Sequence, residues 1–148
     1  MATRFVRTRQ TVDVALAGRQ VRRLVEPRFD ELNVGERDGV PIELYRRWKA
    51  HHATSERFPH GESTDHALQR HARGLRRLVA RPEHVVLVVL HEFALRRIIQ
   101  AAAAIRLADH APANAVPYLF DEAAVTRAAR HLDVPASEVT DESIPAAG

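Results

Sequence analysis

The segment His84-Val-Val-Leu-Val-Val-Leu-His91 constrains the fold of this chain more than any other part of the sequence. Aliphatic residues run through it without interruption, most of them β-branched, and Pro82 precedes it. Such a run, set between a turn and a helical sequence, is typical of a strand buried on both faces. A strand of that kind requires strands beside it and helices above and below it, so the run predicts an α/β fold with a parallel sheet.

The rest of the sequence alternates between helical and strand patterns. Strands are predicted at Val21–Val25 and Pro117–Phe120. Helices are predicted over residues 8–18, 41–49, 93–107 and 121–132, the last capped by Asp121, and between a cap at Ser63 or Thr64 and a stop at Pro82. This order predicts one domain over residues 1–133, an open and mostly parallel sheet with helices on both faces. Residues 134–148 are predicted to form a disordered tail.

Arginine dominates the positive charge of the chain. There are 22 basic and 19 acidic residues, and Lys49 is the sole lysine. Arginine suits bidentate recognition of phosphate and carboxylate. Because acidic residues are interspersed throughout, the chain lacks the basic stripe typical of nucleic-acid-binding proteins, and we expect no nucleic-acid partner.

Other features of the sequence limit the compartment and the chemistry. The absence of cysteine excludes disulfides, thiolate catalysis and a cysteine-based metal site. Residues 1–11 carry arginines but no apolar stretch of the kind found in signal peptides. The longest apolar run, Val85–Leu90, is too short to cross a bilayer. We therefore expect a soluble cytoplasmic protein with no membrane partner.

His91 is the polar residue most directly marked by its position. It follows the predicted buried strand and precedes a predicted helix, so its imidazole and the first helical N–H groups would converge where anions bind. A histidine at the end of a strand also fits a purely structural role, and the pattern alone leaves both interpretations open.

Several segments, in a fixed order, carry a family resemblance. They are Arg7-Thr-Arg-Gln-Thr11, Pro27-Arg-Phe-Asp-Glu-Leu-Asn-Val-Gly-Glu-Arg-Asp-Gly39, Gly61-Glu-Ser63, Val85–His91 and, less closely, Asn114-Ala-Val-Pro-Tyr-Leu-Phe120. Together they make the chain resemble the histidine phosphatase superfamily, which is phosphoglycerate-mutase-like, over nearly its whole length. The resemblance implies an α/β fold and a phosphorylated small-molecule substrate, with neither metal nor organic cofactor.

The resemblance also implies roles for individual residues. Arg7 matches a phosphate-binding arginine, and His91 matches the second active-site histidine, a catalytic residue that also binds phosphate. Glu31 matches the catalytic general acid, which protonates the departing alcohol and then activates water. Residues expected to line the site are Glu62, Ser63, Asn114 and Glu92, the last standing where many members have glycine.

One part of the family pattern has no counterpart in these 148 residues. The first central strand and the Arg-His-Gly motif, which carry the nucleophilic histidine and the first phosphate arginine, are missing. We therefore expect a truncated domain that is inactive as given, because its start has been assigned too late. The alternative is a pseudo-phosphatase that binds a phosphorylated ligand or protein partner without turnover. Phosphatase is favoured over mutase, since the insertions expected of a sugar-phosphate mutase are absent, and the oligomeric state stays open.

Simpler interpretations exist for each candidate residue. Arg7 also fits a flexible basic N-terminus, and Glu31 a solvated loop. Gly35 and Gly39 are interpreted as turn residues that need positive φ. Ser63 and Asp121 fit helix caps without a further role. The remaining histidines that could suggest a metal, His51, His52, His66 and His71, match no strong ligand spacing, and solvated histidines are the favoured interpretation.

Overall fold

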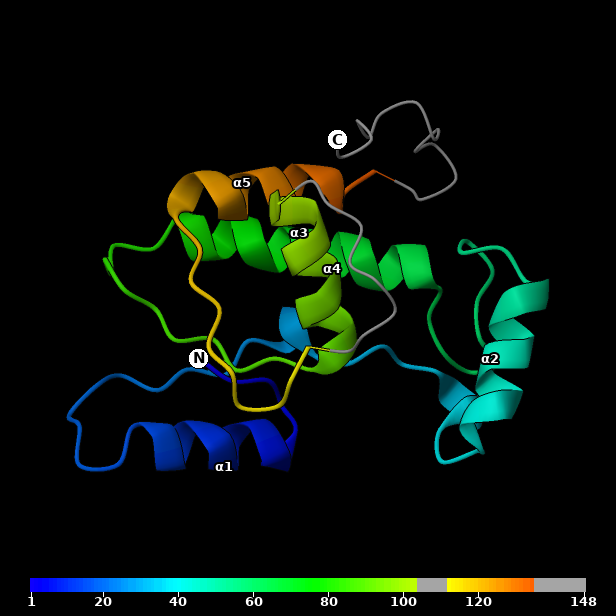
Figure 1. Ribbon diagram of the computed structural model, residues 1–148, viewed down its shortest axis with the longest axis horizontal. Helices are drawn as coiled ribbons and strands as arrows, with labels where there is room; N and C mark the ends of the chain where they lie inside the picture. Colours follow the sequence, from blue (N-terminus) through cyan, green and yellow to red (C-terminus); the bar gives the residue numbers. More distant parts are fainter. Residues whose placement is uncertain (104–111, 135–148) are drawn as a thin grey trace.

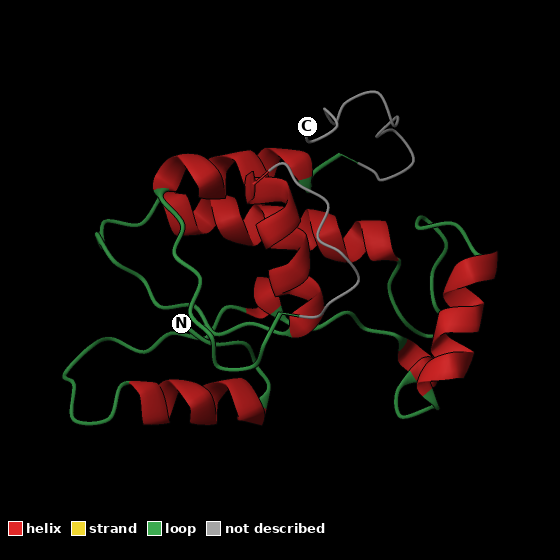
Figure 2. Cartoon of the chain, viewed as in Figure 1, coloured by secondary structure: helices red, strands yellow, loops and turns green. Residues whose placement is uncertain are grey.

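The computed structural model describes residues 1–103 and 112–134, and its secondary structure is helical (Figures 1 and 2). The α-helices are α1 (Val6–Ala15), α2 (Ile42–His51), α3 (Thr64–Val79), α4 (Glu92–Ala103) and α5 (Glu122–His131). Two short 3₁₀ helices, η1 (Pro27–Phe29) and η2 (Gly35–Arg37), interrupt the loop between α1 and α2.

Helices α3, α4 and α5 form the main core. In Figure 1, α5 lies along α3 and α4 crosses them. Their shared cluster combines small and large apolar residues: Phe29, Leu68, Ala72, Leu75, Ile98, Ala101, Ala102, Ala128, Ala129 and Leu132. The buried alanines let the helix backbones approach closely, which allows three short helices to exclude water from a common interior.

Helix η1 is fixed to α3 through Phe29 and Gly74. Phe29 is almost completely buried, and a Cβ at Gly74 would lie only 2.8 Å from its ring. The missing side chain of Gly74 therefore makes room for Phe29. This contact anchors the start of the loop that carries Glu31.

Local capping explains where two of the helices begin. The Ser63 hydroxyl accepts a hydrogen bond of 3.1 Å from the His66 amide, and the Asp121 carboxylate accepts one of 2.7 Å from the Ala124 amide. Both residues were predicted as N-caps, and both predictions are confirmed. Helices α1, α2 and α4 also form near their predicted positions, and the end predicted for α4, residues 104–107, lies outside the described residues.

The predicted α/β sheet is wrong. The described residues form helices and loops with isolated β-bridges and no sheet. The segments predicted as strands are extended but barely paired: Ala2 N–H bonds to the Leu24 carbonyl at 2.9 Å, and Val89 N–H bonds to the Met1 carbonyl at 3.0 Å. A strand pattern favours an extended backbone, but a sheet needs hydrogen-bonding partners along the whole strand, and these contacts cover only one or two residues.

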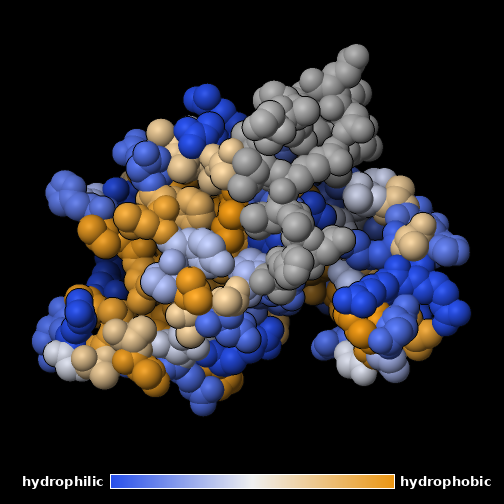
Figure 3. All heavy atoms as spheres, in the orientation of Figure 1, coloured by the Kyte–Doolittle hydropathy of each residue, from blue (hydrophilic) through white to orange (hydrophobic). Residues whose placement is uncertain are grey.

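The unpaired extended segments leave apolar side chains on the surface. Val85, predicted in a strand buried on both faces, is 88% exposed, and Leu119 is 99% exposed. Figure 3 shows hydrophobic surface on the left half of the molecule, where Figure 1 draws the loops before α4 and before α5. No helix among the described residues is long and apolar enough to span a membrane. Most of the predicted tail, residues 135–148, lies outside the described residues.

Candidate functional site

Arg7, Glu31 and His91 come together although they are far apart in the sequence. Nη2 of Arg7 lies 3.0 Å from Nδ1 of His91, and Oε2 of Glu31 lies 3.8 Å from the same nitrogen. Arg7 comes from the first turn of α1, Glu31 follows η1, and His91 directly precedes α4. One guanidinium, one carboxylate and one imidazole thus face a common point, and we call these residues the Arg7–Glu31–His91 site.

His91 is neutral in this arrangement. A guanidinium only donates hydrogen bonds, so Nδ1 accepts from Arg7, while Nε2 lies 2.9 Å from the Thr3 hydroxyl. Burial, followed by the positive charge of Arg7, lowers the pKa of His91 from 6.5 to about 4. The imidazole is therefore not a cationic donor in the unliganded site at neutral pH. A bound anion would oppose both effects and favour the protonated ring.

Glu31 has the opposite tendency. Burial raises the pKa of its carboxyl group, although the Leu32 amide and the charge of Arg7 act against the shift. The Leu32 amide donates to Oε1 at 3.0 Å, which leaves Oε2 toward His91. A carboxyl group whose pKa is raised holds a proton more readily near neutral pH, as a general acid requires.

Arg70 holds the loop that carries Glu31. Its guanidinium donates to the Arg28 carbonyl at 2.9 Å, the Asp30 carbonyl at 3.0 Å and the Glu31 carbonyl at 3.3 Å. The neighbouring His71 places Nε2 3.1 Å from the Asp30 carbonyl. Helix α3 therefore positions Glu31 through the backbone of its loop, and the side chain of Glu31 stays free to face His91.

Glu62 and Ser63 support this loop and this helix. Glu62 pairs with Arg70 at 2.6 Å and accepts from the Asn33 amide at 3.0 Å, and these contacts lower the pKa of its carboxyl group despite the opposing effect of burial. The hydroxyl of Ser63 is used in the cap of α3. Both residues were predicted to line the site. The contacts of Glu62 make it a neighbour of the Glu31 loop, whereas the hydroxyl contact of Ser63 lies within the start of α3.

The other two predicted lining residues differ in position. Glu92 begins α4 beside His91, pairs with Arg96 on the next turn, and its charge raises the pKa of Glu31. Asn114 lies exposed in a turn, and no hydrogen bond to it is present within residues 1–103 and 112–134. The structure thus brings Glu92 near the site and gives Asn114 no contact with Arg7, Glu31 or His91.

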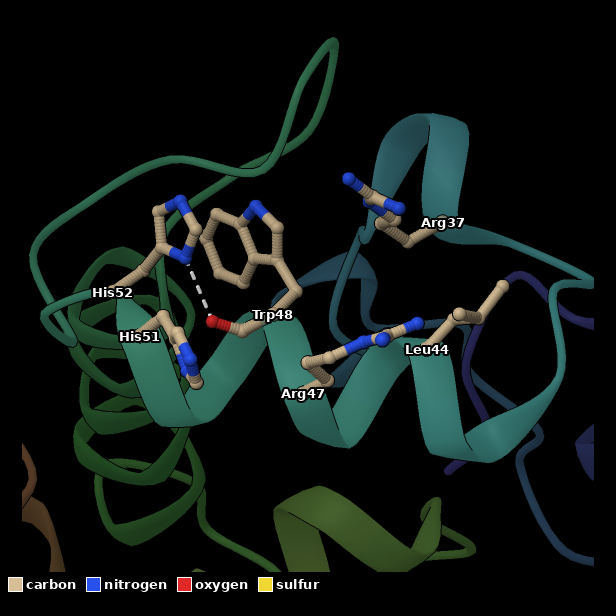
Figure 4. Close-up of a pocket in the computed structure, with 6 residues that line it drawn as sticks. All are labelled: Arg37, Leu44, Arg47, Trp48, His51 and His52. Carbon is tan, nitrogen blue, oxygen red and sulfur yellow. Dashed lines mark hydrogen bonds between the residues drawn. The ribbon is translucent and has the colours of Figure 1, made fainter.

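A separate cavity of about 240 Å³ lies on α2 (Figure 4). It is lined by Arg37, Leu44, Arg47, Trp48, His51 and His52. Nδ1 of His52 lies 2.7 Å from the Trp48 carbonyl, and the two rings stack with centroids 4.0 Å apart. None of the predicted site residues lines this cavity. Within the described part of the chain, no group of three or more His, Cys, Asp or Glu side chains could hold a metal ion.

Most of the chain matches a protein-family model. A family model described as histidine phosphatase superfamily (branch 1) matches residues 1–132. The chain belongs to the histidine phosphatase superfamily. No curated protein and no solved structure gives a significant match.

Membership of the histidine phosphatase superfamily confirms the family prediction and supports a phosphatase-like or mutase-like function. It also gives a context to residues that sequence reasoning missed. Thr3 and Phe5 both contact His91, the first by the hydrogen bond to Nε2 and the second by an edge contact with ring centroids 4.8 Å apart. No pattern in the sequence marks either residue, and only the fold brings them to the imidazole.

The sequence carries a signal for one residue that holds the Glu31 loop. His71 lies on the apolar stripe of α3, three residues after Leu68 and four before Leu75, and it is completely buried. A polar residue on an apolar helical stripe indicates a specific hydrogen-bond partner, because an unpaired polar group is costly to bury.

Proposed function

We propose that the Arg7–Glu31–His91 site binds the phosphoryl group of a phosphomonoester. One observation carries the proposal: Arg7 and His91 share a contact of 3.0 Å beside the carboxyl group of Glu31. A phosphoryl oxygen that replaced this contact would receive hydrogen bonds from the guanidinium and, once protonated, from Nδ1 of the imidazole. Arg7 and His91 can donate to the phosphoryl oxygens, and the carboxyl group of Glu31 can give a proton to the departing alcohol.

The reaction that we propose for this family site is hydrolysis in two steps. The phosphoryl group passes from the ester oxygen to a histidine nitrogen, and Glu31 gives its proton to the departing alkoxide. Water then attacks phosphorus and loses a proton to Glu31, which releases phosphate and the free histidine. Arg7 and His91 stabilise the charge on the phosphoryl oxygens in both steps.

The nucleophile is the part of this reaction that the chain does not supply. Its 148 residues contain no Arg-His-Gly tripeptide. We therefore propose that the 148-residue chain binds phosphomonoesters without hydrolysing them. The alternative function is a non-catalytic module that binds a phosphorylated ligand through the same residues, and it is favoured if no longer form of the protein is active.

The test compares turnover of a generic phosphomonoester at mildly acidic pH by two proteins. One is the 148-residue chain, and the other is a version extended through the upstream coding sequence. Activity only in the extended form, abolished by Glu31→Gln, supports hydrolysis. Inactivity of both forms together with phosphate-dependent thermal stabilisation supports the binding module. If phosphate stabilises neither form, the site does not bind phosphoryl groups and the proposal is wrong.

A further inference from the structure

The cavity on α2, which we call the α2 cavity, combines basic side chains with no acidic one. Of the six residues that line it, two are arginines, two are histidines, and the others are Leu44 and Trp48. Its volume of about 240 Å³ is below the roughly 300–1,000 Å³ of pockets that hold drug-sized ligands. The α2 cavity therefore fits a small molecule, and its charge favours a negative one.

The two arginines of the α2 cavity come from different elements and have free donors. Arg37 lies on η2 and is half-buried, and Arg47 lies on α2 and is exposed. Neither makes an ion pair or a hydrogen bond with another residue of the described part of the chain. Glu36, which precedes Arg37, pairs with His60 at 3.1 Å instead. Both guanidinium groups thus keep their donors for a ligand, and guanidinium recognises phosphate and carboxylate.

Aromatic stacking fixes one wall of the α2 cavity. The Trp48 ring stacks on the ring of His52, with centroids 4.0 Å apart, and on the ring of Phe58, with centroids 4.1 Å apart. Phe58 is almost completely buried, and Nδ1 of His52 donates to the Trp48 carbonyl at 2.7 Å. A wall that is ordered before the ligand arrives lowers the entropic cost of binding.

The indole of Trp48 adds a neutral donor to this wall. Figure 4 shows its nitrogen on the side of Arg37, and the indole N–H has no hydrogen-bond partner among the described residues. An indole and a guanidinium can only donate, so a ligand between Trp48 and Arg37 must offer acceptors. An anion with several oxygen atoms meets this requirement and also matches the charge of the α2 cavity.

We propose that the α2 cavity binds a small polyvalent oxyanion, a polyphosphate or a polycarboxylate, between Arg37 and Arg47. The two guanidinium groups donate to its oxygen atoms from η2 and from α2, and the indole N–H of Trp48 donates from the fixed wall. The α2 cavity shares no residue with the Arg7–Glu31–His91 site, so this ligand binds independently of the phosphomonoester in the proposed function.

Fluorescence titration tests the inference, because Trp48 is the only tryptophan among the 148 residues and lines the α2 cavity. The probes are pyrophosphate, citrate and acetate, compared at one ionic strength so that screening is the same for all. We expect pyrophosphate, citrate or both to change the emission of Trp48 until it saturates. Acetate, which carries a single charge, should bind at least about tenfold more weakly. The polyvalent probe that binds more tightly identifies the ligand class as polyphosphate or polycarboxylate.

Neighbouring arginines on α2 provide a matched control. Arg37→Met and Arg47→Met should each weaken the binding of that probe about tenfold, since each removes a charge-assisted donor. Arg46→Met removes the same charge one position away, from a residue that does not line the α2 cavity, and should bind the probe like the wild-type chain. Thermal unfolding establishes that each variant is folded, and the melting temperature should not change because Arg37 and Arg47 hold no other described residue.

Arg7→Met separates the α2 cavity from the proposed phosphoryl site. The change in Trp48 emission should survive in this variant, whatever the outcome for the proposed function. Where emission does not change, calorimetric titration of Arg7→Met with the same probes gives the affinity instead. The inference is wrong if neither method detects binding, or if Arg46→Met weakens binding as much as Arg37→Met and Arg47→Met do. Loss of the signal in Arg7→Met would assign the anion to the phosphoryl site and also overturn the inference.

Discussion

Arg7 and His91, which are 84 positions apart in the sequence, share a hydrogen bond of 3.0 Å from Nη2 to Nδ1. In this bond the N–H group of Arg7 is the donor and Nδ1 of His91 is the acceptor. An anion can only accept hydrogen bonds, so its binding here requires this bond to break. Arg7 must donate to the anion in place of His91, and Nδ1 of His91 must first be protonated before it can donate as well. Anion binding at this point is therefore coupled to proton uptake by His91.

Replacement of Arg7 should weaken phosphate binding strongly. Arg7→Met removes the guanidinium from the site, and the loss of charge-assisted hydrogen bonds should lower the affinity for inorganic phosphate roughly 10- to 100-fold. Arg9→Met removes the same charge from the exposed face of α1 and should bind phosphate like the wild-type chain. Calorimetric titrations at one ionic strength make the comparison. Equal losses in the two variants would indicate a general charge effect and contradict a role for Arg7 in the site.

The affinity for sulfate should rise as the pH falls from 8 toward 5. The pKa of His91 is lowered to about 4 in the free site, so binding an anion at neutral pH requires the uptake of one proton. The affinity should increase by up to about tenfold per pH unit while the proton is being taken up, and level off below about pH 4. Sulfate is the probe because it does not titrate in this range.

The two titratable neighbours of the anion can be separated by substitution. His91→Gln should remove most of the pH dependence of sulfate binding. The carboxyl group of Glu31, whose pKa is raised, also gains a proton as the pH falls. Glu31→Gln should therefore remove that contribution and keep the part of the pH dependence that is due to His91. A pH dependence that is unchanged in His91→Gln would show that another group takes up the proton.

The free energy of unfolding should fall between about pH 6.5 and pH 4 because of His71. Burial lowers the pKa of His71 from 6.5 to about 4, so the unfolded chain binds its proton first and acid favours unfolding in that window. The full effect is up to about 3 kcal/mol. His71→Gln keeps a donor for the Asp30 carbonyl but does not titrate, so urea unfolding of this variant should show a smaller decrease. Identical pH profiles for the two proteins would contradict the prediction.

Arg70→Met should destabilise the fold by roughly 3 kcal/mol or more, because it removes the cation that pairs with Glu62 and the guanidinium that donates to several loop carbonyls. Adding Glu62→Gln should recover part of that loss, since the unpaired carboxylate is then gone. Arg73→Met, on an exposed position of the same helix, should change the stability by less than about 0.5 kcal/mol. Urea unfolding measures all of these values, and a double variant no more stable than Arg70→Met would argue against the ion pair as the cause.

Gly35 and Gly39 offer a matched pair of substitutions. Both have positive φ, 53° and 73°, as predicted for turn residues. A Cβ at Gly35 would lie 2.0 Å from the Pro59 carbonyl oxygen, whereas a Cβ at Gly39 meets no atom within 4 Å. Gly39→Ala should therefore cost about 1–2 kcal/mol of unfolding free energy, and Gly35→Ala clearly more. Equal costs would show that backbone conformation, and not the close approach to Pro59, decides both.

The helices could be predicted because their signals are local. Ser63 and Asp121 mark helix starts with their own hydroxyl and carboxylate, and the apolar spacing of the following residues sets the buried face. The sheet could not be judged in the same way. The run Val85–Leu90 favours an extended backbone, but the number of its hydrogen-bonding partners depends on segments elsewhere in the chain.

In the candidate site too, residues marked by a local sequence pattern could be predicted and residues brought in by long-range contacts could not. Arg7, Glu31 and His91 could be selected because each lies in a short segment that resembles the family, and the structure brings them together. Their supporting residues could not, since the contact of Thr3 with His91 spans 88 positions and that of Arg70 with the Glu31 carbonyl spans 39. Long-range contacts of this kind leave little trace in the local sequence.

The hydrogen bonds around His91 form a chain with only one direction. The Thr8 hydroxyl donates to the Phe5 carbonyl at 2.9 Å, so it accepts from the Thr3 hydroxyl at 2.8 Å, which in turn accepts from Nε2 of His91. A group that can only accept stands at one end, and Arg7, which can only donate, stands at the other. The carbonyl of Phe5 thus fixes the tautomer of an imidazole 86 positions away. The ring is pinned with its lone pair toward Arg7, and withdrawal of the Arg7 guanidinium is the event that opens that lone pair to a proton.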